Sequence, residues 1–146
     1  MNPLVKTLWR TGNKVSVALY RRTDGRMGGK AIGGVPVLLL TVPGRRTGAP
    51  HTNPVGYFEH SGGYIVVGSA GGRKVEPQWF RNLRAAPAAQ VRVGSRELHV
   101  EVRVLGGAER DEVFRRVVVA RAPGFGKYEQ KSGRQLPLAL LTPARG

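Results

Sequence analysis

The chain has 146 residues, 40% of them hydrophobic, which suits one globular domain with a real core. It has no cysteine, which excludes disulfides and thiolate metal sites, and no apolar run of the roughly 18 residues needed to span a bilayer. Its 24 Lys and Arg residues against 9 Asp and Glu give a net charge of +15, which attracts polyanions such as nucleic acid, anionic lipid or a multiply charged cofactor. Because the N-terminus lacks the features of a signal peptide, we expect a cytoplasmic protein.

The first predicted element is an amphipathic helix over residues 3–22. One face carries Leu4, Leu8, Val15 and Leu19, and the opposite face carries Lys6, Arg10, Lys14 and Arg21. Such a helix packs its apolar face on the rest of the protein, which is the commoner case, or lies on an anionic membrane surface. A glycine-rich connector follows. We therefore expect residues 1–34 to form an N-terminal segment and residues 35–146 to form the main domain.

The middle of the chain is rich in predicted strands, at 35–42, 51–59, 63–69, 88–94 and 97–105. Glycine-containing turns at 61–63 and 94–95 join two hairpins. Short and longer amphipathic helices are expected over 77–84 and 108–121. Pro123 breaks the second helix, residues 122–135 are expected to form a loop, and a last strand covers 136–142. Antiparallel hairpins with helices between and after them favour a small β-barrel of the α+β class.

The segment Gly44-Arg45-Arg46-Thr47-Gly48 follows the first predicted strand and has the composition of an anion-binding turn. Glycine lets backbone N–H groups point inward, and arginine supplies forked donors that match phosphate or carboxylate. A basic turn on the surface explains this segment equally well when it is considered alone.

A second candidate anion site is Ser69-Ala70-Gly71-Gly72-Arg73-Lys74, which follows a strand and precedes the helix near Pro77. The start of that helix adds free N–H groups and a positive dipole end. Trp79 and Leu83 lie one helical turn apart. Their spacing is typical both of a core anchor and of the wall of a cofactor site.

Five pieces in this order resemble the deazaflavin-dependent nitroreductase family. They are Gly44 to Gly48, Thr52-Asn53-Pro54, Ser69 to Gly72, Lys74, and Pro77-x-Trp79-Phe80-x-Asn82-Leu83. Each piece is common alone, but the five in register are specific, and the resemblance covers most of the chain from about residue 35 onward. It implies a split β-barrel and an oxidoreductase that uses coenzyme F-420, an 8-hydroxy-5-deazaflavin with a phosphodiester and an oligoglutamate tail.

The resemblance also implies roles for individual residues. The basic turn and the lysine would hold the phosphate and the tail, small residues would line the deazaflavin ring, and the helix near Pro77 would close its far side. In this order the residues are Arg45, Arg46, Thr47, Gly48 and Lys74; then Thr52, Asn53, Pro54, Ser69, Ala70, Gly71 and Gly72; then Pro77, Trp79, Asn82 and Leu83. Tyr128 falls in a segment that lines the substrate pocket of family members, so it is a candidate proton donor or pocket residue, with a surface tyrosine as the alternative.

The implied function is hydride transfer from reduced coenzyme F-420 to a small organic acceptor, such as a quinone, a nitroaromatic or an activated alkene. Two alternatives stay open: a coenzyme carrier without turnover, and a split-barrel oxidoreductase that uses FMN. FMN is the weaker candidate because two arginines and Lys74 suit a longer anionic tail.

Other partners are predicted more coarsely. We expect no specific nucleic acid partner, because the chain contains no DNA- or RNA-binding motif. We expect no metal, because His51, His60 and His99 lack metal-ligand spacing. A monomer and a homodimer are both compatible with the sequence, and residues 3–22 are the candidate contact with the inner face of the cell membrane.

Overall fold

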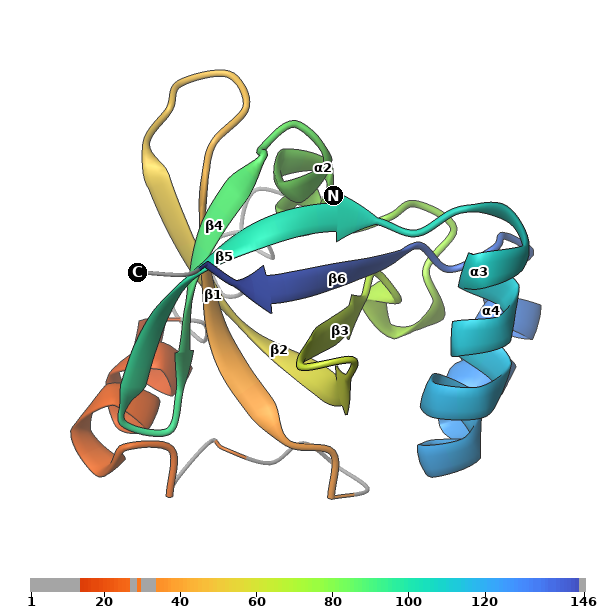
Figure 1. Ribbon diagram of the computed structural model, residues 1–146, viewed down its shortest axis with the longest axis horizontal. Coiled ribbons are helices and arrows are strands. Elements are labelled where there is room, and N and C mark those ends of the chain that lie inside the picture. Colours follow the sequence, from red (N-terminus) through yellow and green to blue (C-terminus); the bar gives the residue numbers. More distant parts are fainter. Residues whose placement is uncertain (1–13, 27–28, 30–33, 145–146) are drawn as a thin grey trace.

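The computed structural model describes residues 14–26, 29 and 34–144. Six antiparallel strands close into a barrel in the order β1-β2-β3-β6-β5-β4 (Figure 1). The strands are β1 (Val37–Pro43), β2 (Pro50–His60), β3 (Gly63–Val67), β4 (Ala88–Val93), β5 (Arg96–Val104) and β6 (Leu138–Pro143). Every predicted strand overlaps its observed counterpart, and the predicted α+β barrel is confirmed.

Alternating side chains fill the inside of the barrel. Leu38, Leu40 and Val42 of β1 are at most 1% exposed and pack in one cluster with residues of the other strands. The helix α2 (Gln78–Arg84) contributes Phe80 and Leu83 to the same cluster, each with no exposed surface. This burial fixes α2, and with it the loop that precedes α2, on the barrel.

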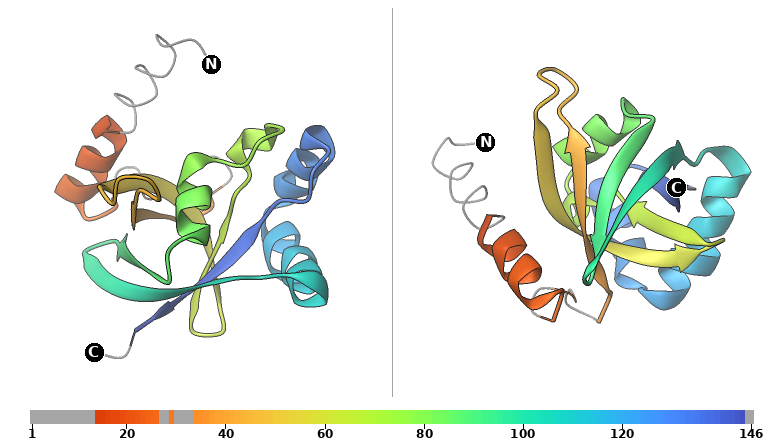
Figure 2. Two further views of the ribbon diagram at one scale, coloured as in Figure 1. Left: turned by 90° about the horizontal axis from the view of Figure 1, so that it is seen from above. Right: turned by 60° about the vertical axis from the view of Figure 1, so that its left-hand side comes forward.

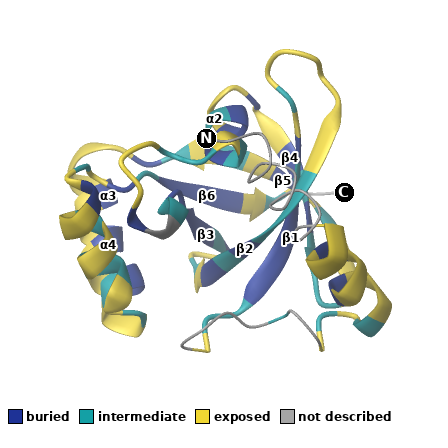
Figure 3. Cartoon of the chain, turned by 180° about the vertical axis from the view of Figure 1, so that it is seen from behind, coloured by how far each residue is buried: buried dark blue, intermediate teal, exposed yellow. Residues whose placement is uncertain are grey.

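A second cluster lies between the barrel and three helical segments. α3 (Gly107–Val113) continues into the π-helical segment η2 (Phe114–Val119), and α4 (Gly124–Ser132) packs beside them (Figures 1 and 3). Their apolar residues cover Ile65 of β3 and Leu138 of β6. The helix break at Pro123 is confirmed. The loop expected over 122–135 is wrong, because Pro123 caps α4.

The N-terminal helix, described over residues 14–23, packs on β1 (Figure 2). Val17 and Tyr20 are buried against Val37 and Leu39. The Tyr20 hydroxyl donates to the carbonyl of Val37 at 2.9 Å and accepts from the N–H of Gly94 at 2.8 Å. These bonds join the helix to both β1 and the turn after β4.

The packed face is not the predicted one. Val15 is 55% exposed and Leu19 is 39% exposed, and at 3.6 residues per turn they lie on the opposite side of the helix from Val17 and Tyr20. The remaining residues of the predicted apolar face, Leu4 and Leu8, lie outside the described residues. Across the part of the chain that the structure describes, no helix has the length and apolar character required to cross a bilayer.

Candidate functional site

The loop between β1 and β2 projects from the barrel and is anchored to α2 by Arg45 (Figure 1). Nη1 of Arg45 donates to Oδ1 of Asn82 at 2.7 Å, and the backbone N–H of Arg45 donates to the same oxygen at 3.2 Å. Nη2 of Arg45 donates to Oε1 of Gln78 at 2.8 Å. Asn82 is buried, so its amide oxygen depends on Arg45 for hydrogen bonding. The structure thus joins two predicted coenzyme-binding residues directly.

The other basic residues of the candidate site face solvent. Arg46 and Lys74 are exposed, and Lys74 lies in the segment that leads into α2, the helix to which Arg45 is bonded. Within the loop, Thr47 Oγ1 accepts the N–H of Ala49 at 3.2 Å, and Gly48 has a φ of 74°. Since α2 has only seven residues, we attribute anion binding to these basic side chains and not to the end of the helix.

The loop after β3 lies against α4. It contains a short turn, η1 (Ala70–Gly72), and Gly72 has a φ of 83°. A Cβ on Gly72 would lie 3.3 Å from Cδ1 of Tyr128 and 3.2 Å from Cδ of Lys131, so glycine allows α4 to approach the loop backbone. Tyr128 is 38% exposed, and its ring meets Phe125 edge to face with centroids 5.7 Å apart. The structure therefore brings Tyr128 to the segment predicted to hold the deazaflavin ring.

The three residues predicted on β2 do not share one face. Thr52 pairs with Thr41 and Pro54 pairs with Leu39, on the side of the sheet that meets the N-terminal helix. The hydroxyls of Thr41 and Thr52 are 2.7 Å apart. Asn53 pairs with Leu40, which points into the barrel. Side chains of these three residues therefore cannot form one continuous wall.

The residues predicted on and before α2 also have different surroundings. Pro77 caps α2, and Trp79 is half-buried with its ring edge to face against Phe80, centroids 5.5 Å apart. Leu83 has no exposed surface. The structure favours the core-anchor explanation for Leu83, whereas Trp79 keeps surface that a ligand can contact.

One side chain at this site has no counterpart in the sequence analysis. Arg134 donates to the carbonyls of Gly68, Ser69 and Arg73 at 3.1, 3.1 and 3.0 Å. Burial lowers the pKa of Arg134 and Glu76 acts in the opposite direction, and an arginine remains charged at neutral pH. A single arginine in a segment expected to be a loop belongs to no motif, so only the structure shows that Arg134 contacts this site.

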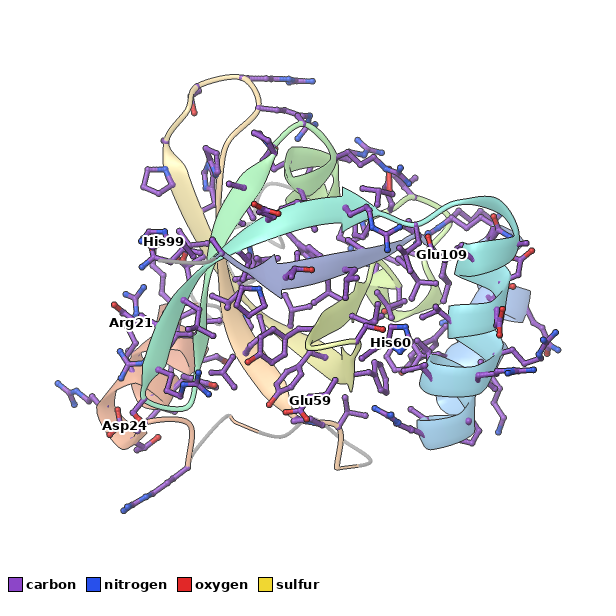
Figure 4. All side chains as sticks on the ribbon, viewed as in Figure 1. Arg21, Asp24, Glu59, His60, His99 and Glu109 are labelled. Carbon is purple, nitrogen blue, oxygen red and sulfur yellow. The ribbon has the colours of Figure 1, made fainter. Side chains whose placement is uncertain are left out.

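Other hollows and titratable groups lie apart from these residues. Two open depressions, of about 280 and 270 Å³, are lined by none of the predicted site residues; the first includes Tyr57 and Arg121, the second Thr41 and His99. His60 lies near Glu109 beside α3, while His99 lies at the other side of the barrel (Figure 4). Among the described residues, no three His, Cys, Asp or Glu side chains gather as a metal ion would require.

Comparison with known proteins gives a consistent result. The family model for the F420H(2)-dependent quinone reductase matches residues 13–143. The chain is 31% identical over 127 residues to the F420H(2)-dependent quinone reductase Rv1261c of Mycobacterium tuberculosis, covering 86% of this chain and 85% of the relative. A solved F420-H2 dependent reductase, FDR-A, is 30% identical with a TM-score of 0.65, covering 73% of this chain and 93% of its own. A structure described as a domain-swapped dimer is 27% identical with a TM-score of 0.68, covering 93% and 98%.

Proposed function

This chain belongs to the F420H(2)-dependent quinone reductase family, and we propose that its acceptor is a quinone. It is an oxidoreductase that transfers a hydride from reduced coenzyme F-420 to a small organic acceptor. The match of the family model to residues 13–143 carries this conclusion. The contact between Tyr128 and the Gly72 turn supports it, because it places a phenol beside the segment expected to meet the coenzyme ring.

The residues present fit such a coenzyme. The bound deazaflavin would supply the hydride chemistry, and the protein would supply binding, orientation and electrostatics. Arg46 and Lys74 are exposed cations suited to phosphate and carboxylate groups, and Arg45 holds their loop to α2. The turn at Ala70–Gly72 carries only small side chains, so a flat ring can approach its backbone.

We further propose that Tyr128 gives a proton to the acceptor. A quinone that receives a hydride becomes a hydroquinone anion, and one proton then completes the hydroquinone. The Tyr128 ring is partly exposed next to Gly72, so its hydroxyl can reach a molecule bound at this surface. General acids in such positions contribute to rate when they lie within hydrogen-bond reach of the reacting group.

A panel of acceptors tests the quinone proposal. The protein is mixed with reduced coenzyme F-420 and a naphthoquinone, a nitroaromatic or an activated alkene, and reoxidation of the coenzyme is followed by absorbance. We expect the quinone to have the highest kcat/KM. Faster reduction of the nitroaromatic or the alkene would replace the quinone as the acceptor class, and binding without reoxidation by any acceptor would favour a carrier.

Lys74 and Arg46 give a prediction about coenzyme affinity. Replacing either with alanine should weaken coenzyme binding by about 1.5–3 kcal/mol, the usual contribution of a hydrogen bond to a charged group. Added salt should weaken wild-type binding more than binding by the variants. Fluorescence titration measures both effects. Arg45→Ala should cost at least as much, because it also frees the loop from Asn82 and Gln78; unchanged dissociation constants for all three would place the tail elsewhere.

The outward face of the N-terminal helix supports a proposal about location. Val15 and Leu19 are exposed large apolar residues on one face, and Lys14, Arg21 and Arg22 are exposed beside them. Apolar insertion together with cation attraction to anionic headgroups is typical of a helix lying on a membrane surface. Such contact would bring the enzyme to lipid-soluble quinones.

We therefore expect the protein to float with anionic vesicles at low salt and the Val15→Ser, Leu19→Ser double variant to lose most of that binding. Each exposed basic residue near the surface contributes about 1 kcal/mol, so high salt should also release the protein. Val75→Ser is the matched control, because Val75 is 56% exposed but lies outside the helix. Equal flotation of both variants, or no flotation of the wild type, would contradict the proposal.

A further inference from the structure

The Arg134 guanidinium binds several backbone carbonyls of one turn in the candidate site. It donates to the carbonyls of Gly68 and Ser69 through Nη2 and to the carbonyl of Arg73 through Nε, all at 3.0–3.1 Å. The Val75 carbonyl lies 3.5 Å from the same Nη2. One side chain thus spans the whole segment between β3 and α2 that carries Lys74.

The end of α4 fixes the direction of Arg134. Gly133 closes the helix with a φ of 67°, and its N–H donates to the carbonyl of Glu129 at 3.2 Å. The buried Ser132 hydroxyl accepts the N–H of Arg134 at 3.2 Å. These contacts make the backbone of Arg134 part of the helix end, so the guanidinium is held by α4, the helix that also carries Tyr128.

The turn that Arg134 binds contains a residue in an unfavourable backbone conformation. Ala70 has a φ of 48°, a conformation that residues with a Cβ rarely adopt and that persists when the surroundings hold it. Since the C=O and N–H of a trans peptide point in opposite directions, carbonyls drawn to Arg134 turn the N–H groups of Ser69, Ala70 and Lys74 away from it. The guanidinium therefore sets which backbone donors remain for a ligand.

We propose that Arg134 is a positioning residue of the coenzyme site, which fixes the Gly68–Val75 turn before the anionic coenzyme binds. This inference rests on the proposed function for the identity of the ligand. In the absence of coenzyme, α4 already orders the turn through Arg134. A guanidinium suits this role because its rigid planar fork presents donors from separate nitrogens, whereas a lysine ammonium is a compact point charge with rotatable donors.

Limited proteolysis tests the ordering without coenzyme. Trypsin can cut after Arg73 and Lys74, both of which are exposed, and mass spectrometry follows each site. In Arg134→Ala we expect cleavage at these two positions to rise about tenfold or more, because local opening governs proteolysis, with cleavage elsewhere unchanged. Arg121→Ala is the matched control: Arg121 also donates to a carbonyl, that of Glu59, at 3.0 Å, but away from this turn.

Coenzyme binding provides the second readout. For Arg134→Ala we expect the dissociation constant of oxidised coenzyme F-420 to rise about tenfold, with the KM for the quinone unchanged. This is the effect of losing one hydrogen bond between the turn and the charged coenzyme. Arg134→Lys should fall between wild type and alanine, and guanidinium ion added at millimolar concentration should partly restore both protection and affinity in Arg134→Ala.

Two outcomes would overturn the positioning role. One is a protected turn with a coenzyme dissociation constant within about twofold of the wild-type value, which is below the contribution of one hydrogen bond to a charged group. The other is a uniform rise in cleavage along the chain, which would show general destabilisation. Wild-type turnover with quinone is measured in the same series, so failure of the proposed function is recognised separately from failure of this inference.

Discussion

Replacing Tyr128 with phenylalanine is expected to slow acceptor reduction by about 10²-fold or more, the usual contribution of a general acid, with coenzyme affinity unchanged. The ring stays against Gly72 and Phe125 in this variant, so the turn that Tyr128 supports should keep its conformation. Only the phenol hydroxyl is removed. Single-turnover reoxidation of reduced coenzyme by a quinone measures the rate, and fluorescence titration measures the affinity.

Tyr64→Phe is the control, because Tyr64 lies at the opposite end of β3 from the turn, with its ring edge to face against Tyr57. It should leave both quantities at the wild-type level. Turnover by Tyr128→Phe equal to that of wild type with several quinones would reduce Tyr128 to a packing residue, and loss of coenzyme affinity would give it a binding role instead.

Arg110→Ala should lower the free energy of unfolding by about 3 kcal/mol, the lower end of the loss for one partner of a buried ion pair, because the Glu129 side chain is 31% exposed. Arg110 is 5% exposed and donates to Oε2 of Glu129 at 2.6 Å and to the carbonyl of Leu136 at 2.7 Å. Its guanidinium also lies 4.3 Å from the centroid of the Phe114 ring. Removal leaves the carbonyl of Leu136 without this donor and Oε2 of Glu129 with only the N–H of Leu136, and urea denaturation measures the cost.

Arg103→Ala is a control, because Arg103 also pairs with a carboxylate, that of Glu109, but both side chains are exposed. Exposed ion pairs contribute little, so this variant should unfold close to the wild-type midpoint. Glu129→Gln keeps the shape of the pair and should lose less than Arg110→Ala. Equal stability of Arg110→Ala and wild type would mean that the core clusters alone hold α4 to the barrel.

The strands could be predicted from the sequence because apolar runs and glycine turns are local signals. The segment after Pro123 was harder, since two glycines in its first turn, Gly124 and Gly126, favour a loop. Its ends nevertheless carry helix signals: proline just before the first turn and Gly133 just after the last. The N-terminal helix was predicted correctly as a helix over its described part, but its packed face depends on tertiary contacts of Tyr20 that helical periodicity does not reveal.

The candidate site was predictable where residues form an ordered motif, as in the basic turn and the Pro77–Leu83 helix. The sequence also singled out Arg45 and Asn82 separately, and the structure shows that they are bonded to each other. Arg134 could not be predicted, because its partners are backbone carbonyls more than fifty residues away in the chain. Backbone carbonyls are the same in every residue type, so no sequence pattern marks a side chain that binds them.

The central claim is that the hydride comes from a deazaflavin. Under anaerobic conditions the protein is mixed with a quinone and either reduced coenzyme F-420 or reduced FMN, and absorbance follows both reactants. We expect coenzyme F-420 to bind at micromolar concentration or tighter and to be reoxidised as an equimolar amount of quinone disappears. FMN should bind far more weakly and react no faster than without protein. Equal turnover with FMN, or no protein-dependent reoxidation of coenzyme F-420, would contradict it.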